Sequence, residues 1–195
     1  MNSSITIVEK PDWVSWEDIK QCLVDAHAIN RAAGINMTHY QWPAEKIKDS
    51  VENNGTMLVA LDGEKVVGTA AIVNKQGRNW YVPGQYAYMC YAAVLPEYSG
   101  QGIYKALIKK REEIAREKHF DILLLDTHYE NKRIQEIAKK NDYRYVQFLR
   151  ARSKDHYSVV MVKWLSGCPY SRLFCFWKYT VSKIKTIISG GFRCR

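Results

Sequence analysis

Short apolar and alternating runs along the chain predict its strands. Residues 56–61 and 65–73 are rich in β-forming side chains, and Asp62-Gly63-Glu64 between them predicts a hairpin turn. Residues 85–95 form a run longer than an ordinary strand, which predicts a bulge or a splay. The continuous apolar run at 120–125 predicts a strand buried on both faces. Further strands are expected at residues 5–8, 143–148 and 156–164.

Helical spacing of apolar positions predicts helices at residues 15–34, 43–55, 103–118 and 131–141. Ser15 and Asp18 have the spacing of a capping box, and Gly34 is a plausible helix stop. The resulting order is β-α-α-β-β-β-α-β-α-β-β. This order predicts one α/β domain over residues 1–164, followed by a tail over 165–195.

Composition narrows the class of protein. The chain has 195 residues, of which 47% are hydrophobic and 25% charged, so it is expected to fold rather than to be disordered. No run is long and apolar enough for a membrane span, and the first ten residues lack a secretory pattern, so we expect a cytoplasmic protein. Five cysteines without a C-x-x-C pair argue against a disulfide framework and a zinc ribbon, and no metal is expected. Cys22 and Cys90 are predicted to be small buried apolar residues.

The basic charge is concentrated in the tail. The net charge is +9, and the residues after Trp164 hold six cations and no acid, so 9 − 6 leaves +3 for the rest of the chain. Projecting residues 170–189 at helical spacing places their large apolar side chains on one arc with cations at both edges. This pattern is typical of a peripheral helix at an anionic membrane surface, here the inner face of the membrane. The alternatives are a helix docked on the domain or against a second subunit in a homodimer. Nucleic acid is the least favoured partner, because no recognition motif accompanies the charge.

A glycine-containing turn stands between the long strand and the third predicted helix. It reads Val94-Leu95-Pro96-Glu97-Tyr98-Ser99-Gly100-Gln101-Gly102-Ile103. Glycines let backbone N–H groups approach a phosphate closely, and the helix N-terminus adds the positive end of its dipole. The turn therefore predicts an anion cradle, although such turns also need glycine for purely conformational reasons.

This turn and the element order resemble the GNAT N-acetyltransferase superfamily, whose motif is Val-x-Pro-x-Tyr-(Arg/Gln)-Gly-x-Gly-Ile-(Gly/Ala). Ser99 and Tyr104 depart from that motif. The resemblance implies a mixed, mostly antiparallel α/β fold with helices on both faces. It also implies an acyltransferase, transferring groups other than amino-acyl groups, that takes acetyl-CoA or another short acyl-CoA. The implied cofactor-binding residues are Ala93, Val94, Ser99, Gly100, Gln101, Gly102, Ile103, Tyr104, Lys105 and Asn131.

The resemblance implies only some of the groups that acyl transfer needs. The family's Asn-x-x-Ala-x-x-x-Tyr segment matches here only at Asn131, because Ala138 stands where the family has its tyrosine acid. Backbone donors near Tyr91 would face the thioester carbonyl. His128, expected just beyond the fifth strand, is the candidate base because imidazole titrates near neutral pH, and proton relay by water is the alternative.

The acceptor site is expected around residues 34–42, between the first two predicted helices. Aromatic side chains suit an amino sugar, such as an envelope precursor, or an aromatic amine better than a polyamine, and half of them are equally well explained as core. A non-catalytic CoA-binding regulatory or membrane-surface module is the competing function. The candidate acceptor residues are Tyr40, Trp42, Trp80, Tyr81, Tyr86 and Tyr88, with Asp126 and Thr127 at the end of the fifth strand.

Overall fold

In the computed structural model, the chain forms two compact units. Of the described residues, the first unit comprises 5–35, 41–74 and 86–120, and the second comprises 85, 121–150, 156–166 and 172–191. The structure describes residues 5–35, 41–74, 85–150, 156–166 and 172–191.

Four strands of the first unit pair in the order β1-β2-β3-β4, each antiparallel to its neighbour. The predicted hairpin is confirmed, because β2 and β3 are joined at Asp62 and Lys65. In β3, Ala71 and Val73 face one side of the sheet while Ala70 and Ile72 face the other, and all four are buried. Both faces of this sheet are therefore covered. The bounds are Thr6–Glu9 (β1), Gly55–Asp62 (β2), Lys65–Asn74 (β3) and Tyr86–Val94 (β4).

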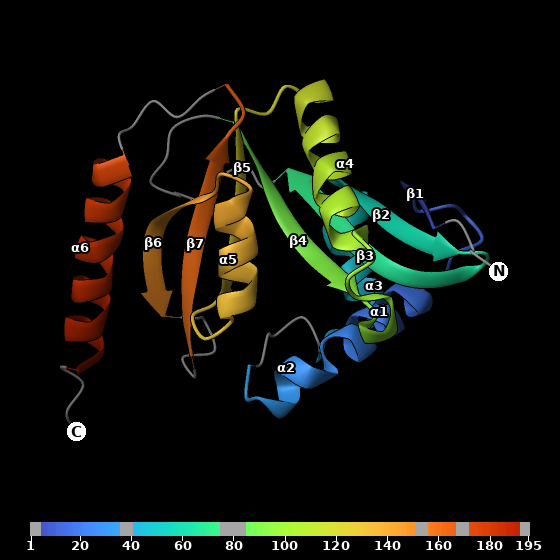
Figure 1. The fold of residues 1–195 in the computed structure, drawn as a ribbon, viewed down its shortest axis with the longest axis horizontal. Coiled ribbons are helices and arrows are strands. Elements are labelled where there is room, and N and C mark those ends of the chain that lie inside the picture. The colour runs from blue at the N-terminus through green and yellow to red at the C-terminus, as the bar shows by residue number, and fades with distance from the viewer. Residues whose placement is uncertain (1–4, 36–40, 75–84, 151–155, 167–171, 192–195) are drawn as a thin grey trace. The chain divides into compact units, whose positions relative to one another are not determined.

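Helices cover the two faces of the first unit. Helices α1 (Trp16–Ala26) and α3 (Ala44–Glu52) contribute Ile19, Leu23, Ile47 and Val51 to one apolar cluster with β2, β3 and β4. Helix α4 (Ile103–Glu117) contacts β2, β3 and β4, and its buried side chains lie outside that cluster. Figure 1 shows α4 lying along the sheet on the side away from α3. The predicted arrangement of helices on both faces is thus present here.

The first predicted helix is wrong in one respect, because it is interrupted at His27. The predicted capping box at Ser15 and Asp18 is present and starts α1. His27 then leaves helical geometry with φ −101° and ψ 8°, and a short helix α2 (Ala28–Ala32) follows. The sequence pattern merged the two helices because nothing near His27 is a strong helix breaker.

The second unit holds three strands in the order β5-β7-β6, also paired antiparallel, together with helix α5 (Lys132–Lys140). Strand β5 (Ile122–His128) runs three residues further than predicted. The strand therefore includes three residues that were expected at its end or in the loop after it. These residues, which pair with β7, are Asp126, Thr127 and His128. The other two strands are β6 (Arg144–Arg150) and β7 (Tyr157–Trp164).

Helix α6 (Arg172–Gly191) covers the free edge of β6 (Figure 1). The tail is thus helical as predicted, and it packs on the second unit. Within the described ranges, none of the helices is long and apolar enough to cross a membrane.

Candidate functional site

The predicted anion cradle is an open turn at the start of α4. Gly100 and Gly102 have φ values of 82° and 80°, a backbone conformation that side chains rarely adopt. A Cβ atom at either glycine would meet no protein atom within 4 Å, so conformation, and not crowding by the protein, requires glycine. Ser99, Gln101 and Lys105 are exposed around the turn, and Tyr104 is half-buried.

The N-terminus of α4 carries no acidic side chain. Its N-cap is Gly102, which makes no side-chain capping bond, and the first turn holds no acid. By contrast, α1 is capped by Ser15 and has two acids in its first turn. The first N–H groups of a helix have no partner within the helix, and its dipole favours an anion there. The turn can therefore hold a phosphate group through its backbone.

Strand β4 contains the predicted irregularity. Cys90 pairs with Ala71 and Ala93 pairs with Thr69, so Tyr91 and Ala92 together oppose the single residue Ala70. This is a β-bulge, and Tyr91 adopts φ 51°, which is unfavourable for a residue with a large side chain. Thr69 stabilises the bulge, because its buried hydroxyl donates a 2.8 Å hydrogen bond to the carbonyl oxygen of Tyr91.

The Tyr91 phenol is part of the core. It lies 2.8 Å from Ser50 Oγ, which itself donates to the carbonyl of Ile47 at 2.7 Å, so Tyr91 is the donor in this pair. Burial raises the pKa of Tyr91 to about 12. At neutral pH the phenol is therefore protonated and engaged with α3. If Tyr91 takes part in the chemistry, it therefore does so through its backbone and not through its phenol.

His27 is a site residue that the sequence reasoning missed. Its ring Nδ1 lies 3.0 Å from Asn30 Nδ2, and the ring also bonds the backbone of Ala92 in the bulge. Burial lowers the pKa of His27 to about 4, and the Ala92 bond, which favours the protonated ring, offsets this only in part. His27 is therefore neutral at physiological pH. The available signal was that His27 and Asn30 share one side of the predicted helix with the apolar residues Leu23 and Ala26.

His128 is a buried group at the end of β5 in the second unit. Its Nδ1 accepts a 3.1 Å hydrogen bond from the N–H of Glu130, and its ring stacks on His156 with centroids 4.6 Å apart. In the neutral ring, the proton must then lie on Nε2, and the one nitrogen lone pair is already engaged. To act as a base in this arrangement, His128 would have to give up the bond to Glu130.

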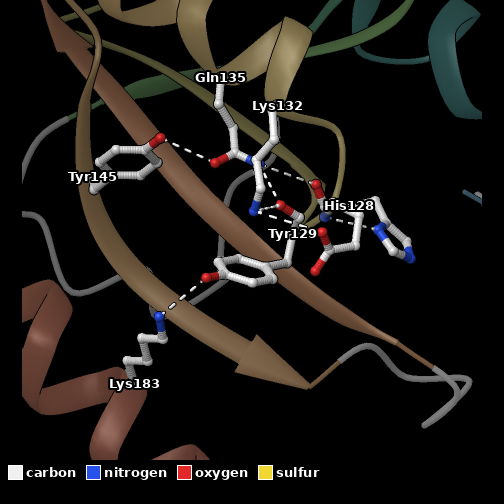
Figure 2. Close-up of polar contacts among 7 residues, drawn as sticks. His128, Tyr129, Lys132, Gln135, Tyr145 and Lys183 are labelled. Carbon is white, nitrogen blue, oxygen red and sulfur yellow. Dashed lines mark hydrogen bonds and ion pairs between the residues drawn. The ribbon is translucent and has the colours of Figure 1, made fainter.

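The turn after β5 is held by side chains of α5 (Figure 2). The amide of Gln135, which is buried, donates to the carbonyl oxygens of His128 and Tyr129 at 3.3 and 2.7 Å, and Lys132 also donates to Tyr129. Tyr145 in turn donates to Gln135 Oε1 at 3.0 Å. Asn131 is the N-cap of α5 and accepts from the N–H of Ile134 at 3.4 Å, so its carboxamide oxygen is engaged in capping.

Three of the candidate acceptor residues lie on one side of the first unit. Tyr86 and Tyr88 are half-buried on β4, and Tyr88 pairs with Val73, so it faces the side that α1 and α3 cover. Trp42 is half-buried against the same apolar cluster, with the ammonium of Lys46 4.2 Å from its ring centroid. Tyr40, Trp80 and Tyr81 lie outside the described residues. Asp126 is half-buried and Thr127 buried, both on β5 of the second unit.

Solved structures of similar fold are acetyltransferases. The acetyltransferase from Streptococcus agalactiae is 20% identical, with a TM-score of 0.64 over 85% of this chain and 100% of that one. A GNAT family acetyltransferase from Elizabethkingia anophelis, solved with acetyl-CoA bound, is 15% identical, with a TM-score of 0.62 over 85% of this chain and all of that one. The ribosomal-protein-S18-alanine N-acetyltransferase from Escherichia coli is 13% identical, with a TM-score of 0.63 over 86% and 98% of the two chains.

These likenesses confirm the α/β fold predicted from the sequence. A search of curated proteins finds no match to the sequence. The family model for the acetyltransferase (GNAT) family matches residues 16–143, a span that includes the cradle, the bulge and the turn after β5. The chain belongs to the GNAT acetyltransferase family, and it is an acyltransferase of that family.

Proposed function

We propose that this protein transfers an acetyl group from acetyl-CoA to a primary amine. The observation that carries the proposal is the cradle at the start of α4, where Gly100 and Gly102 hold left-handed backbone beside a helix N-terminus without acids. A pyrophosphate fits such a turn through backbone N–H groups alone, so the serine at position 99 costs at most one side-chain contact. The relative from Elizabethkingia anophelis, which has acetyl-CoA bound, supports acetyl-CoA as the donor.

The reaction requires an unprotonated amine. Its nitrogen attacks the thioester carbonyl, a C–N bond forms, and the C–S bond breaks to release CoA thiolate. The amine gives up one proton and the thiolate takes up one, so the exchange balances. Backbone N–H groups at the bulge around Tyr91 are our candidates to stabilise the oxyanion. Because the lone pair of the His128 ring is engaged and Tyr91 is protonated in the core, we assign both proton transfers to water.

For the acceptor we propose an amino sugar or an aromatic amine. The half-buried rings of Trp42, Tyr86 and Tyr88 share one side of the first unit and offer stacking faces. Aromatic faces bind sugar rings and aromatic rings by apolar contact. A lipid-linked envelope precursor is one member of this class, because it combines an amino sugar with a membrane location.

Calorimetric titration with acetyl-CoA tests the donor site. Gly102→Val should abolish detectable binding, because its side chain would occupy the space that the phosphates need and would disfavour the left-handed backbone. Gly34→Val is the matched control, because Gly34 has φ 75° and equally open surroundings but lies outside the cradle. If the wild-type protein binds no acetyl-CoA at millimolar concentration, or if both variants lose binding equally, the cradle is not the donor site.

Release of free CoA thiol tests the reaction. We expect the release to depend on the acceptor in a panel of amino sugars, aromatic amines and polyamines, with amino sugars and aromatic amines the faster substrates. The absence of an acid at Ala138 makes a non-catalytic module the competing function. Tight acetyl-CoA binding without thiol release for any amine would favour that module.

A further inference from the structure

Helix α6 is attached to the second unit through its small and polar side chains. Ser182 Oγ accepts a 2.8 Å hydrogen bond from the N–H of Phe148 on β6, and Thr186 Oγ1 donates to the carbonyl oxygen of the same residue at 3.1 Å. Tyr179 packs against Tyr145 and Phe148 on the same side. Because β6 is the last strand of its sheet, these two hydroxyls satisfy backbone groups that a further strand would otherwise pair.

The apolar side of α6 points the other way. At 100° per residue, its large apolar residues centre almost opposite Ser182 and Thr186. Helix α6 holds seven of the nine exposed large apolar residues in the described part of the chain, and six of these seven are between 50% and 80% exposed. Docking on the domain therefore does not use this face. The exposed stripe consists of Leu173, Phe176, Trp177, Ile184, Ile187 and Ile188.

The charge around the stripe is of one sign. Lys178 and Lys185 follow one edge and Lys183 lies toward the other, and the sequence holds no acid after Asp155. Lys183 is anchored near the edge by a 3.2 Å bond to the hydroxyl of Tyr129 (Figure 2). Aromatic and branched apolar side chains between cations match the interface of an anionic bilayer, where rings enter the headgroup region and ammonium groups meet phosphates.

We infer that the exposed stripe of α6 binds the surface of an anionic lipid bilayer, while the opposite side of the helix stays docked on β6. This inference goes beyond acetyl transfer and does not depend on it. A second copy of the chain fits the stripe less well, because pairing two such helices would bring like charges together with no acid on either helix to compensate. A nucleic acid would meet the cations but would leave the apolar residues unused.

Co-sedimentation of the full chain with vesicles tests this inference. At low salt, we expect binding to vesicles of equal parts phosphatidylcholine and phosphatidylglycerol, weaker binding to phosphatidylcholine alone, and release by added salt. Replacing both Trp177 and Ile184 by Ser should weaken binding about tenfold or more. Lys185→Glu should weaken binding to the anionic vesicles alone.

The matched control is Trp13→Ser, because Trp13 is 57% exposed and lies in the first unit. It should bind vesicles as the wild-type protein does. Melting temperatures should be similar for all variants, because the replaced side chains are exposed, and this excludes unfolding as the cause of a loss. The inference is overturned if the wild-type protein is a monomer that does not bind the anionic vesicles. It is equally overturned if the wild-type protein does not bind them and is a dimer that the Trp177 and Ile184 changes dissociate, because the stripe would then be a dimer interface. It is also overturned if those two changes leave vesicle binding intact.

Discussion

The hydroxyl of Thr69 on β3 donates a 2.8 Å hydrogen bond to the carbonyl oxygen of Tyr91 in the bulge of β4. Tyr91 holds a left-handed backbone with φ 51° although it carries a large side chain. A backbone in that region costs on the order of 1–2 kcal/mol and persists only where neighbouring contacts enforce it. The hydrogen bond from Thr69 to the Tyr91 carbonyl and the hydrogen bond from the Tyr91 phenol to Ser50 are two such contacts. The bulge is therefore built from residues that lie far apart in the sequence.

Replacing Thr69 by Val should destabilise the protein by about 1–3 kcal/mol, because the carbonyl of Tyr91 would lose the hydrogen bond from the Thr69 hydroxyl. The catalytic rate should fall as well if the bulge positions the thioester. Thr69→Ser keeps the hydroxyl and should recover most of the activity. Urea unfolding and kcat measured on both variants give the answer, and equal kcat for the Val variant and the wild-type protein would contradict the role of the bulge.

Tyr91→Phe should retain most of the acetyl-transfer activity. The change removes the hydrogen bond to Ser50, at a cost of about 1 kcal/mol in unfolding free energy, but keeps the ring in the core. The phenol, with its pKa raised to about 12, is not expected to exchange protons near neutral pH. A loss of kcat of about a hundredfold or more, without a comparable loss of stability, would instead identify the phenol as a catalytic group.

His27 should make stability depend on pH between about 4 and 6.5. Its pKa is about 4 in the folded protein and near 6.5 when exposed, so in that interval the unfolded chain holds a proton that the folded protein does not. Stability therefore falls as the pH decreases from about 6.5 toward 4, by about 1–3 kcal/mol from this group. In His27→Gln this share of the pH dependence should disappear. Urea unfolding of both proteins at pH 7 and about pH 4.5 measures this difference. If the unfolding free energy changes by the same amount between the two pH values in both proteins, the assignment to His27 is refuted.

His128→Gln should lower kcat less than about tenfold and leave its pH profile between about pH 6 and 8 unchanged. The reason is that Gln can accept the bond from the N–H of Glu130, which is the contact that His128 makes here. Steady-state kinetics over that interval decide the question. Loss of an ascending limb with a midpoint near neutral pH would show that His128 acts as the base.

Ser182→Ala should cost about 1 kcal/mol of unfolding free energy, because the N–H of Phe148 on the edge strand would lose its partner. Ser189→Ala is the control, since Ser189 is exposed and, among the described residues, donates to the carbonyl of Thr186 within α6. Thermal unfolding compares the two variants. Equal stability of both would mean that the Ser182 hydrogen bond contributes little to holding α6 on β6.

Local patterns in the sequence were sufficient for much of the fold. The capping box at Ser15, the hairpin around Gly63 and the glycines of the cradle all depend on residues within a few positions of one another. Turn geometry and helix capping are short-range effects, so residue type and spacing determine them. The unusual length of the β4 run even indicated its irregularity.

Only the tertiary structure determined which residues distant in the sequence contact one another. His27 bonds the backbone of Ala92, and the Tyr91 phenol bonds Ser50 on α3; each contact joins residues that lie far apart in the sequence. Strand β5 extends to His128 because β7 pairs with it there, which no local pattern reveals. The helical projection of the tail located its apolar side correctly, but which side of α6 faces the protein depended on the unpaired edge of β6. Hydrogen bonding at that edge, at Phe148, favours Ser182 and Thr186 and leaves the apolar side exposed.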